Sequence, residues 1–190
     1  MTLKLKIIIA STRPGRKGPI VADWVKTFAD EFGQFEVDLV DLAELDLPLL
    51  DEPKHPAMKD YQHDHTKRWS AIIDGADAFV FVTPEYDFFA PAALVNAIQC
   101  LSREWKYKPA AIVSYGGISG GLRSTQELRL LFSNVGGVAL PQSVPMPFFN
   151  QFIGEDGIFT PNEPMLDGIK LTFTELLKWA TALKPMRETA

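Results

Sequence analysis

Residues 3–23 read LKLKIIIASTRPGRKGPIVAD, and this stretch decides the fold. Ile7, Ile8 and Ile9 form an unbroken β-branched run, which is typical of a strand buried on both faces. Residues 10–18, ASTRPGRKG, then interrupt the run before an amphipathic helix begins. A buried strand that feeds a helix through a polar loop is the repeating unit of an α/β protein with a parallel sheet.

The loop at residues 10–18 carries groups that suit a phosphate. They lie just before a helix N-terminus, where backbone N–H groups are free and the helix dipole is positive. The loop has neither the G-x-G-x-x-G of dinucleotide sites nor the G-x-x-x-x-G-K-[ST] of NTP sites, so we expect a mononucleotide phosphate monoester. The alternative is that the hydroxyls cap a turn and the cations are solvated. The groups are Ser11, Thr12, Arg13, Arg16, Lys17 and two glycines, Gly15 and Gly18.

Composition bounds the class of protein. The chain has 190 residues, 46% of them hydrophobic, which predicts a single domain over residues 1–190 with a sizeable core. The net charge of −5 argues against nucleic acid as a partner, because phosphate neutralisation needs a basic face. A single cysteine, Cys100, is expected in the core of a protein from a reducing compartment. The lack of a signal peptide or an apolar run of about 20 residues predicts a cytoplasmic protein without a membrane partner.

Strand and helix patterns alternate along the rest of the chain. Such alternation predicts a doubly wound parallel sheet of five strands in the order 2-1-3-4-5, with helices on both faces and the strand-to-helix loops meeting at one edge. Residues 45–64 read as a long surface loop and residues 141–164 as a proline-rich excursion. Further strands are predicted at 35–42, 78–82, 109–115 and 138–140, and helices at 20–32, 69–76, 94–105, 122–135 and 166–183.

Three loops are expected to converge at that edge. The loop at 11–18 is cationic; the loop at 84–87 carries Glu85 and Tyr86 and leads to an apolar Phe-Phe pair; the loop at 116–121 has four glycines. Such a set suits an amphiphilic ligand with a charged tail and a flat head. Because glycines lose so much conformational freedom on folding, the third loop favours close approach of a ligand over a simple flexible turn.

The combined motifs resemble the NADPH-dependent FMN reductase family of flavodoxin-like proteins, which includes quinone, azo-dye and chromate reductases. The resemblance covers nearly the whole chain, and its motifs are specific in combination. One position departs from the family pattern, which usually reads Pro-Glu-Tyr-Asn, because Asp87 replaces the amide. The matching residues are Ser11, Arg13, Arg16, Pro19, Pro84, Glu85, Tyr86, Asn96, Ala97, Lys108, Pro109, Ser114, Tyr115, Gly116 and Gly117.

The resemblance implies an NAD(P)H-dependent oxidoreductase that carries FMN and passes electrons to a small acceptor in a ping-pong cycle. It implies FMN phosphate at the first loop, the isoalloxazine ring at residues 84–87 and a homodimer, with a homotetramer as the alternative. No catalytic side chain and no metal are expected, because FMN carries the chemistry. The expected FMN-binding residues are Ser11, Thr12, Arg13, Arg16, Gly18, Pro19, Ile20, Pro84, Glu85, Tyr86, Asp87, Ser114, Tyr115, Gly116 and Gly117.

Other classes of function stay open at this point. An electron-carrier flavodoxin would share the fold without using a nicotinamide, and a non-redox phosphate-binding module would not bind flavin. A metal site at His63 and His65 is disfavoured, because no third convergent ligand is evident in the sequence. The electron acceptor and the choice between NADPH and NADH are not encoded in a recognisable motif.

Overall fold

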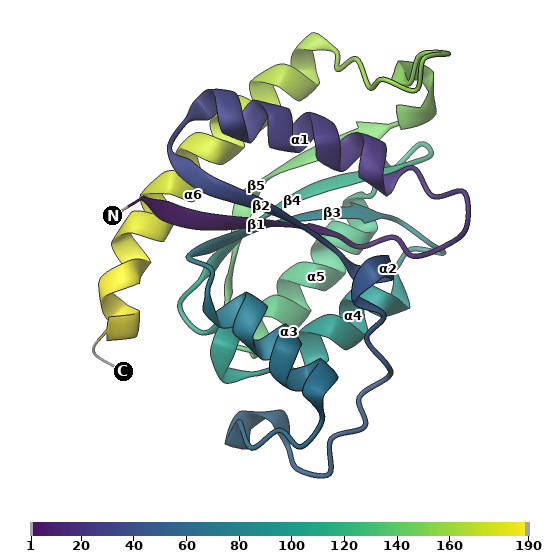
Figure 1. The fold of residues 1–190 in the computed structure, drawn as a ribbon. Helices are drawn as coiled ribbons and strands as arrows, with labels where there is room; N and C mark the ends of the chain where they lie inside the picture. The colour runs from purple at the N-terminus through teal and green to yellow at the C-terminus, as the bar shows by residue number, and fades with distance from the viewer. Residues whose placement is uncertain (1, 189–190) are drawn as a thin grey trace.

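The computed structural model describes residues 2–188 and contains a five-stranded parallel sheet in the order β2-β1-β3-β4-β5 (Figure 1). This confirms the predicted flavodoxin-like topology. The strands are β1 (Leu3–Ile9), β2 (Phe35–Asp41), β3 (Ala78–Pro84), β4 (Pro109–Gly116) and β5 (Val138–Pro147). The helices are α1 (Gly18–Phe32), α2 (Leu42–Leu45), α3 (Asp64–Asp74), α4 (Ala92–Gln99), α5 (Leu122–Asn134) and α6 (Glu163–Glu188).

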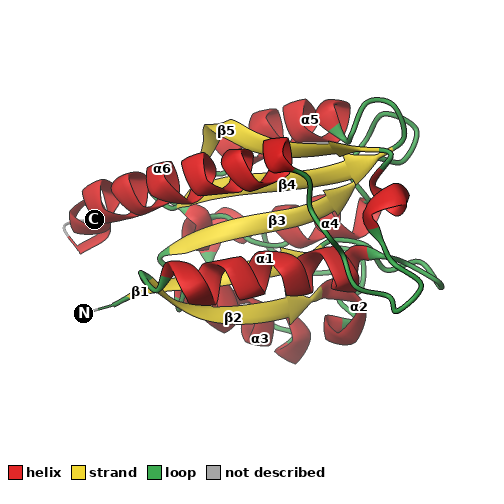
Figure 2. Cartoon of the chain, turned by 90° about the horizontal axis from the view of Figure 1, so that it is seen from above, coloured by secondary structure: helices red, strands yellow, loops and turns green. Residues whose placement is uncertain are grey.

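Helices cover both faces of the sheet and give the protein two apolar cores. Helices α1 and α6 pack on one face, while α3, α4 and α5 pack on the other (Figures 1 and 2). Alternate residues of β1 serve the two cores: Ile7 packs with α1 and α6, whereas Ile8 packs with α3 and α4. The unbroken isoleucine run is therefore explained by burial on both faces.

The helix predicted at 94–105 is shorter in the structure. Helix α4 ends at Gln99, and a separate 3₁₀-helix spans Arg103–Trp105. The fully buried Trp105 folds back, and its Nε1 donates a hydrogen bond to the carbonyl of Ile98 over 3.0 Å. Trp105 therefore packs back on the last turn of α4, a contact that helical periodicity alone does not reveal.

Strand β5 extends beyond its prediction, from Val138 to Pro147, so the excursion is shorter than expected. Its prolines are tolerated because β5 is an edge strand, where one side of the backbone needs no ladder partner. The register of β5 against β4 shifts between Ala110 and Ile112. The longer strand carries residues 148–151 to the edge where the other strand-to-helix loops lie.

Two features bear on the function classes considered. No helix within residues 2–188 combines the length and apolar character needed to cross a membrane. His63 and His65 stack at 5.2 Å, and His65 bonds to Asp51 over 2.9 Å. The described part of the chain contains no group of three or more His, Cys, Asp or Glu residues placed to hold a metal ion.

Candidate functional site

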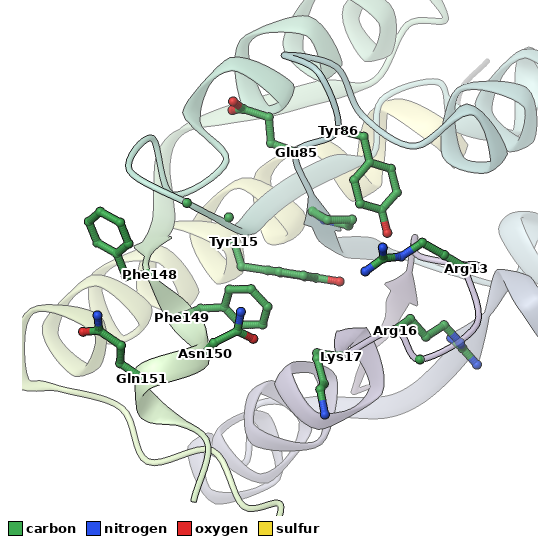
Figure 3. Close-up of a pocket in the computed structure, with 14 residues that line it drawn as sticks. Arg13, Arg16, Lys17, Glu85, Tyr86, Tyr115, Phe148, Phe149, Asn150 and Gln151 are labelled. Atoms are coloured by element: carbon green, nitrogen blue, oxygen red, sulfur yellow. The ribbon is translucent and has the colours of Figure 1, made fainter.

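A cavity of about 450 Å³ lies at the carboxyl edge of the sheet, where the loops after β1, β3 and β4 meet (Figure 3). The predicted convergence of these loops is therefore confirmed. A fourth segment, which follows β5, completes the wall. The lining residues are Arg13, Gly15, Arg16, Lys17, Pro84, Glu85, Tyr86, Tyr115, Gly116, Gly117, Phe148, Phe149, Asn150 and Gln151.

The cations of the first loop differ in what they contact. Arg16 forms a bidentate ion pair with Asp41 at the end of β2, with N–O distances of 2.8 and 2.6 Å, and Figure 3 shows its side chain turned away from the cavity. Arg13 and Lys17 are exposed and have no ion-pair partner within residues 2–188. The Arg13 guanidinium lies 5.9 Å from the centre of the Tyr86 ring. Arg16 is thus already paired with a carboxylate in this structure, whereas Arg13 and Lys17 are not paired in the part of the chain that is described.

Two buried hydroxyls, Ser11 Oγ and Tyr115 Oη, lie beside the start of α1; neither has a partner in good hydrogen-bond geometry among the described residues, although Ser11 is near enough to Tyr115 to influence its phenol. A Cβ on Gly18 would stand 2.2 Å from Ser11 Oγ and 2.9 Å from Tyr115 Oη, so a side chain there would displace these hydroxyls. Burial raises the pKa of the Tyr115 phenol, which keeps it protonated as a donor. Its ring packs against Phe149 at 4.6 Å. In the described part of the chain Ser11 Oγ has no partner in good geometry, so it does not cap a turn, and the N-cap residue of α1, Lys17, makes no side-chain cap hydrogen bond.

In the second loop, Glu85 holds neighbouring chain segments together. Its carboxylate accepts hydrogen bonds from Ser119 Oγ (2.8 Å), the Arg123 backbone N–H (2.9 Å) and Arg123 Nη1 (3.0 Å). Burial raises the pKa of Glu85, but these hydrogen bonds and the Arg123 charge outweigh it and lower the pKa overall. Figure 3 shows the carboxylate directed away from Tyr86 and Arg13. Glu85 therefore joins the second loop to the N-terminus of α5.

The residues after Glu85 form a strained turn. Tyr86 and Phe89 exchange backbone hydrogen bonds of 2.9 Å, and the two residues between them, Asp87 and Phe88, have φ values of 48° and 77°. A bulky residue rarely adopts such a φ. The Arg123 guanidinium lies 4.2 Å from the Phe88 ring centre. Helix α4 has no side-chain cap among the described residues, so Asp87 does not cap it.

The third loop divides into two halves. Gly116 and Gly117 line the cavity, and a Cβ on Gly117 would meet nothing within 4 Å. Gly120 and Gly121 approach the protein's own chain instead: their Cβ atoms would lie 2.7 Å from Pro147 N and 2.6 Å from Ser114 Cβ. Close approach of a ligand therefore does not explain the last two glycines. The buried Ser114 Oγ donates to the Gly120 carbonyl over 2.9 Å.

Seven of the residues predicted to bind the cofactor do not line the cavity. Ser11, Gly18 and Ser114 are buried, Thr12 and Asp87 are exposed, and Pro19 and Ile20 are half-buried in the first turn of α1, where Ile20 packs against the core. The segment 148–151 was missed, because the proline pattern hid the second half of β5. A parallel strand read through to Pro147 would have placed the following residues at this edge.

Comparisons with known proteins agree with this geometry. Residues 3–151 match the family model described as NADPH-dependent FMN reductase. The chain is 44% identical over 123 residues to an NAD(P)H-dependent FMN reductase of Schizosaccharomyces pombe, an alignment that covers 64% of this chain and 62% of that protein. It thus spans less than two thirds of that relative's length.

Two further likenesses cover more of their counterparts. An NAD(P)H-dependent FMN reductase of Saccharomyces cerevisiae is 35% identical over 164 residues, which are 76% of this chain and 85% of that protein. The solved structure of a flavoenzyme NAD(P)H:(acceptor) oxidoreductase from Paracoccus denitrificans superposes with a TM-score of 0.74 and 21% identity, covering 95% of this chain and 98% of the other. This likeness supports the fold, and the family match extends over most of the chain. The chain belongs to the NADPH-dependent FMN reductase family.

Proposed function

We propose that the protein is an FMN-containing, NAD(P)H-dependent oxidoreductase that passes electrons to a small acceptor: a quinone, an azo dye, a metal oxyanion or free flavin. One observation carries the proposal. The cavity joins a loop with unpaired cations to a wall of aromatic rings and glycine backbone, which suits a ligand with an anionic tail and a flat head. Family membership supports the same reading.

The residues at the tail end fit a phosphate. Among the described residues Arg13 and Lys17 have no ion-pair partner and the first turn of α1 has no side-chain cap, so its N–H groups keep their capacity for a ligand. The buried hydroxyls of Ser11 and Tyr115 are also unsatisfied, and an unsatisfied buried polar group is costly. Arg13 and Lys17 would supply the charge-assisted hydrogen bonds.

The residues at the head end fit a planar ring. Tyr86 offers an aromatic side chain, and the backbone of Gly116 and Gly117 lies open along the wall. Phe148 is 50% exposed and borders the cavity from the β5 side. When bound, FMN supplies the redox chemistry by accepting a hydride from the nicotinamide and passing electrons to the acceptor. The side chains of this pocket bind and orient the reactants and exclude water.

The function is tested by reconstituting the purified protein with FMN and mixing it anaerobically with NADPH or NADH. We expect stoichiometric FMN binding, bleaching of flavin absorbance by the nicotinamide, and recovery when an acceptor is added. FMN binding without bleaching would indicate an electron carrier. Failure to bind FMN would leave the phosphate-binding module as the function. Steady-state rates with a panel of acceptors would then identify the preferred class.

The exposed aromatic residues before α4 and the buried cysteine bear on the oligomeric state and the compartment of the protein. We propose one FMN-binding domain over residues 1–190 and a cytoplasmic homodimer whose interface uses α4 and the aromatic residues before it. Phe88 and Phe89 are 60% and 59% exposed, an apolar surface that a second copy would cover. Cys100 is buried and free, which fits a reducing compartment. Sedimentation at micromolar concentration should give twice the chain mass; a monomer with full activity would exclude this interface, and four times the mass would indicate the tetramer.

A further inference from the structure

Asp41 lies at the carboxyl end of the edge strand β2, opposite Ile9 of β1, and belongs to none of the motifs discussed above. Both of its carboxylate oxygens bind the Arg16 guanidinium, at 2.8 and 2.6 Å. The two side chains are only 11% and 19% exposed. A bidentate, largely buried pair of this kind fixes the relative geometry of the segments that carry it.

The pair is connected to the backbone on both sides. Arg16 Nη1 also donates to the carbonyl of Ser11 over 3.0 Å, and Asp41 Oδ1 accepts from the Ala43 N–H over 2.9 Å. Within the loop, the Arg16 N–H donates to the Arg13 carbonyl over 3.1 Å. Arg16 is therefore bonded to the start of its own loop and to the end of β2. Arg13, which lies between these contacts, keeps its guanidinium free.

We propose that Asp41 is a positioning residue for the phosphate loop, acting through Arg16, and that Arg16 itself does not hold the ligand's phosphate. The inference rests on the proposed function, because it assigns the loop its ligand. The Asp41–Arg16 pair holds the loop so that Arg13 stays on the cavity side. Arg16, although positively charged, then fixes the shape of the loop and does not contact the phosphate. Asp41, although negatively charged and outside the loop, is then needed for the loop to bind an anion.

This role predicts an effect opposite in sign to that of charge alone. Asp41→Asn removes a negative charge beside an anion site and releases Arg16 from its partner. If Arg16 binds the phosphate, or if only net charge matters, FMN should then bind more tightly. If Asp41 positions the loop, FMN should bind more weakly, because Arg16 loses its bidentate partner and the loop its fixed shape.

The experiment measures FMN and riboflavin dissociation constants for four variants by flavin fluorescence. For Asp41→Asn we expect FMN binding to weaken by about five- to tenfold, with riboflavin affected less than twofold, because riboflavin has no phosphate. Arg16→Lys keeps the charge but not the bidentate geometry, so it should weaken FMN binding similarly. The double variant Asp41→Asn/Arg16→Lys should be no weaker than either single variant, since all three remove the same pair.

Asp38→Asn is the matched control. It removes one carboxylate from the same strand, at an exposed position where Asp38 pairs with Lys6, and should bind FMN like the wild type. Tighter FMN binding by Asp41→Asn, or wild-type binding by Arg16→Lys, would overturn the inference. Equal losses for FMN and riboflavin would also overturn it, because they would indicate general disruption. Failure of the wild type to bind FMN would instead overturn the proposed function, so the two failures are distinguishable.

Discussion

The loops after β1 and β3 border the same cavity and are fixed by similar means, yet they present opposite chemistry. Each is anchored by a carboxylate–arginine pair: Asp41 with Arg16 in the first loop, and Glu85 with Arg123 in the second. In the first, the loop contributes the cation and the partner strand the anion. In the second, the loop contributes the anion and α5 the cation. In each loop, one charged side chain is therefore paired within the protein and is not available to a ligand.

What the anchors leave over decides what each loop offers a ligand. The first loop keeps Arg13 and Lys17 without ion-pair partners among the described residues, so it is suited to an anion. The second keeps Asp87 and the exposed rings of Tyr86 and Phe88. A charge counted in a sequence is thus not a charge available for binding, because neighbouring side chains determine which groups remain free.

The largest effect is expected from filling the space at Gly18, which would break the packing of the first loop. Gly18→Val should destabilise the fold by about 3 kcal/mol, because a Cβ there would meet Ser11 Oγ at 2.2 Å and Tyr115 Oη at 2.9 Å. Urea unfolding measures the loss. The control is Gly117→Val, where a Cβ would meet nothing within 4 Å. Equal stabilities for the two variants would contradict the steric argument.

Removing Arg13 takes away a cation of the first loop that is unpaired among the described residues and leaves the Asp41–Arg16 pair intact. Arg13→Ala should weaken FMN binding by roughly 1.5–3 kcal/mol, the contribution of a charge-assisted hydrogen bond. Riboflavin binding should change little, because riboflavin has no phosphate. The free energy of unfolding should also change little, because Arg13 is exposed. Fluorescence titration with both flavins tests this. An equal loss for the two ligands would show that Arg13 does not act on the phosphate.

Releasing the anchor of the second loop should have a smaller effect. Glu85→Gln should lower the free energy of unfolding by about 1–2 kcal/mol, because a neutral amide cannot replace a carboxylate that accepts three hydrogen bonds. Ser119→Ala, which removes one donor, is the milder comparison. Chemical denaturation at pH 7 measures both variants. A Glu85→Gln protein as stable as the wild type would show that the Glu85–Arg123 pair does not stabilise the second loop.

The same pair predicts a pH dependence. The pKa of Glu85 is lowered from 4.5 in the folded protein, so its stabilising contribution is complete above pH 4.5 and is lost as the pH falls through the lowered value. The difference in stability between wild type and Glu85→Gln should therefore shrink on acidification below about pH 4.5. A difference that stays constant down to pH 3 would show that the charge of Glu85 contributes nothing.

The sequence predicts the parts of this molecule that depend on local pattern. The Ile7–Ile9 run identifies the central strand, and the alternation of strands and helices predicts the sheet order and the converging loops. It does not predict contacts between distant residues. Asp41 and Arg16 are 25 positions apart, and Glu85 and Arg123 are 38 apart, so neither pair has a periodic signature. Phe148 was missed because prolines obscured an edge strand.

The smallest effect concerns the charge that the second loop leaves exposed. Asp87 has no hydrogen-bond or ion-pair partner within residues 2–188, and Asn tolerates its φ of 48° at least as well. Asp87→Asn should therefore preserve the fold. If the carboxylate lies near the flavin, it disfavours an anionic reduced ring, but water screens an exposed charge to about 1 kcal/mol. For a two-electron couple this corresponds to about 20 mV. Redox titration should show a midpoint potential raised by about this amount in Asp87→Asn. An unchanged midpoint at unchanged FMN affinity would place the side chain away from the ring. The second loop would then act on the flavin only through its aromatic residues.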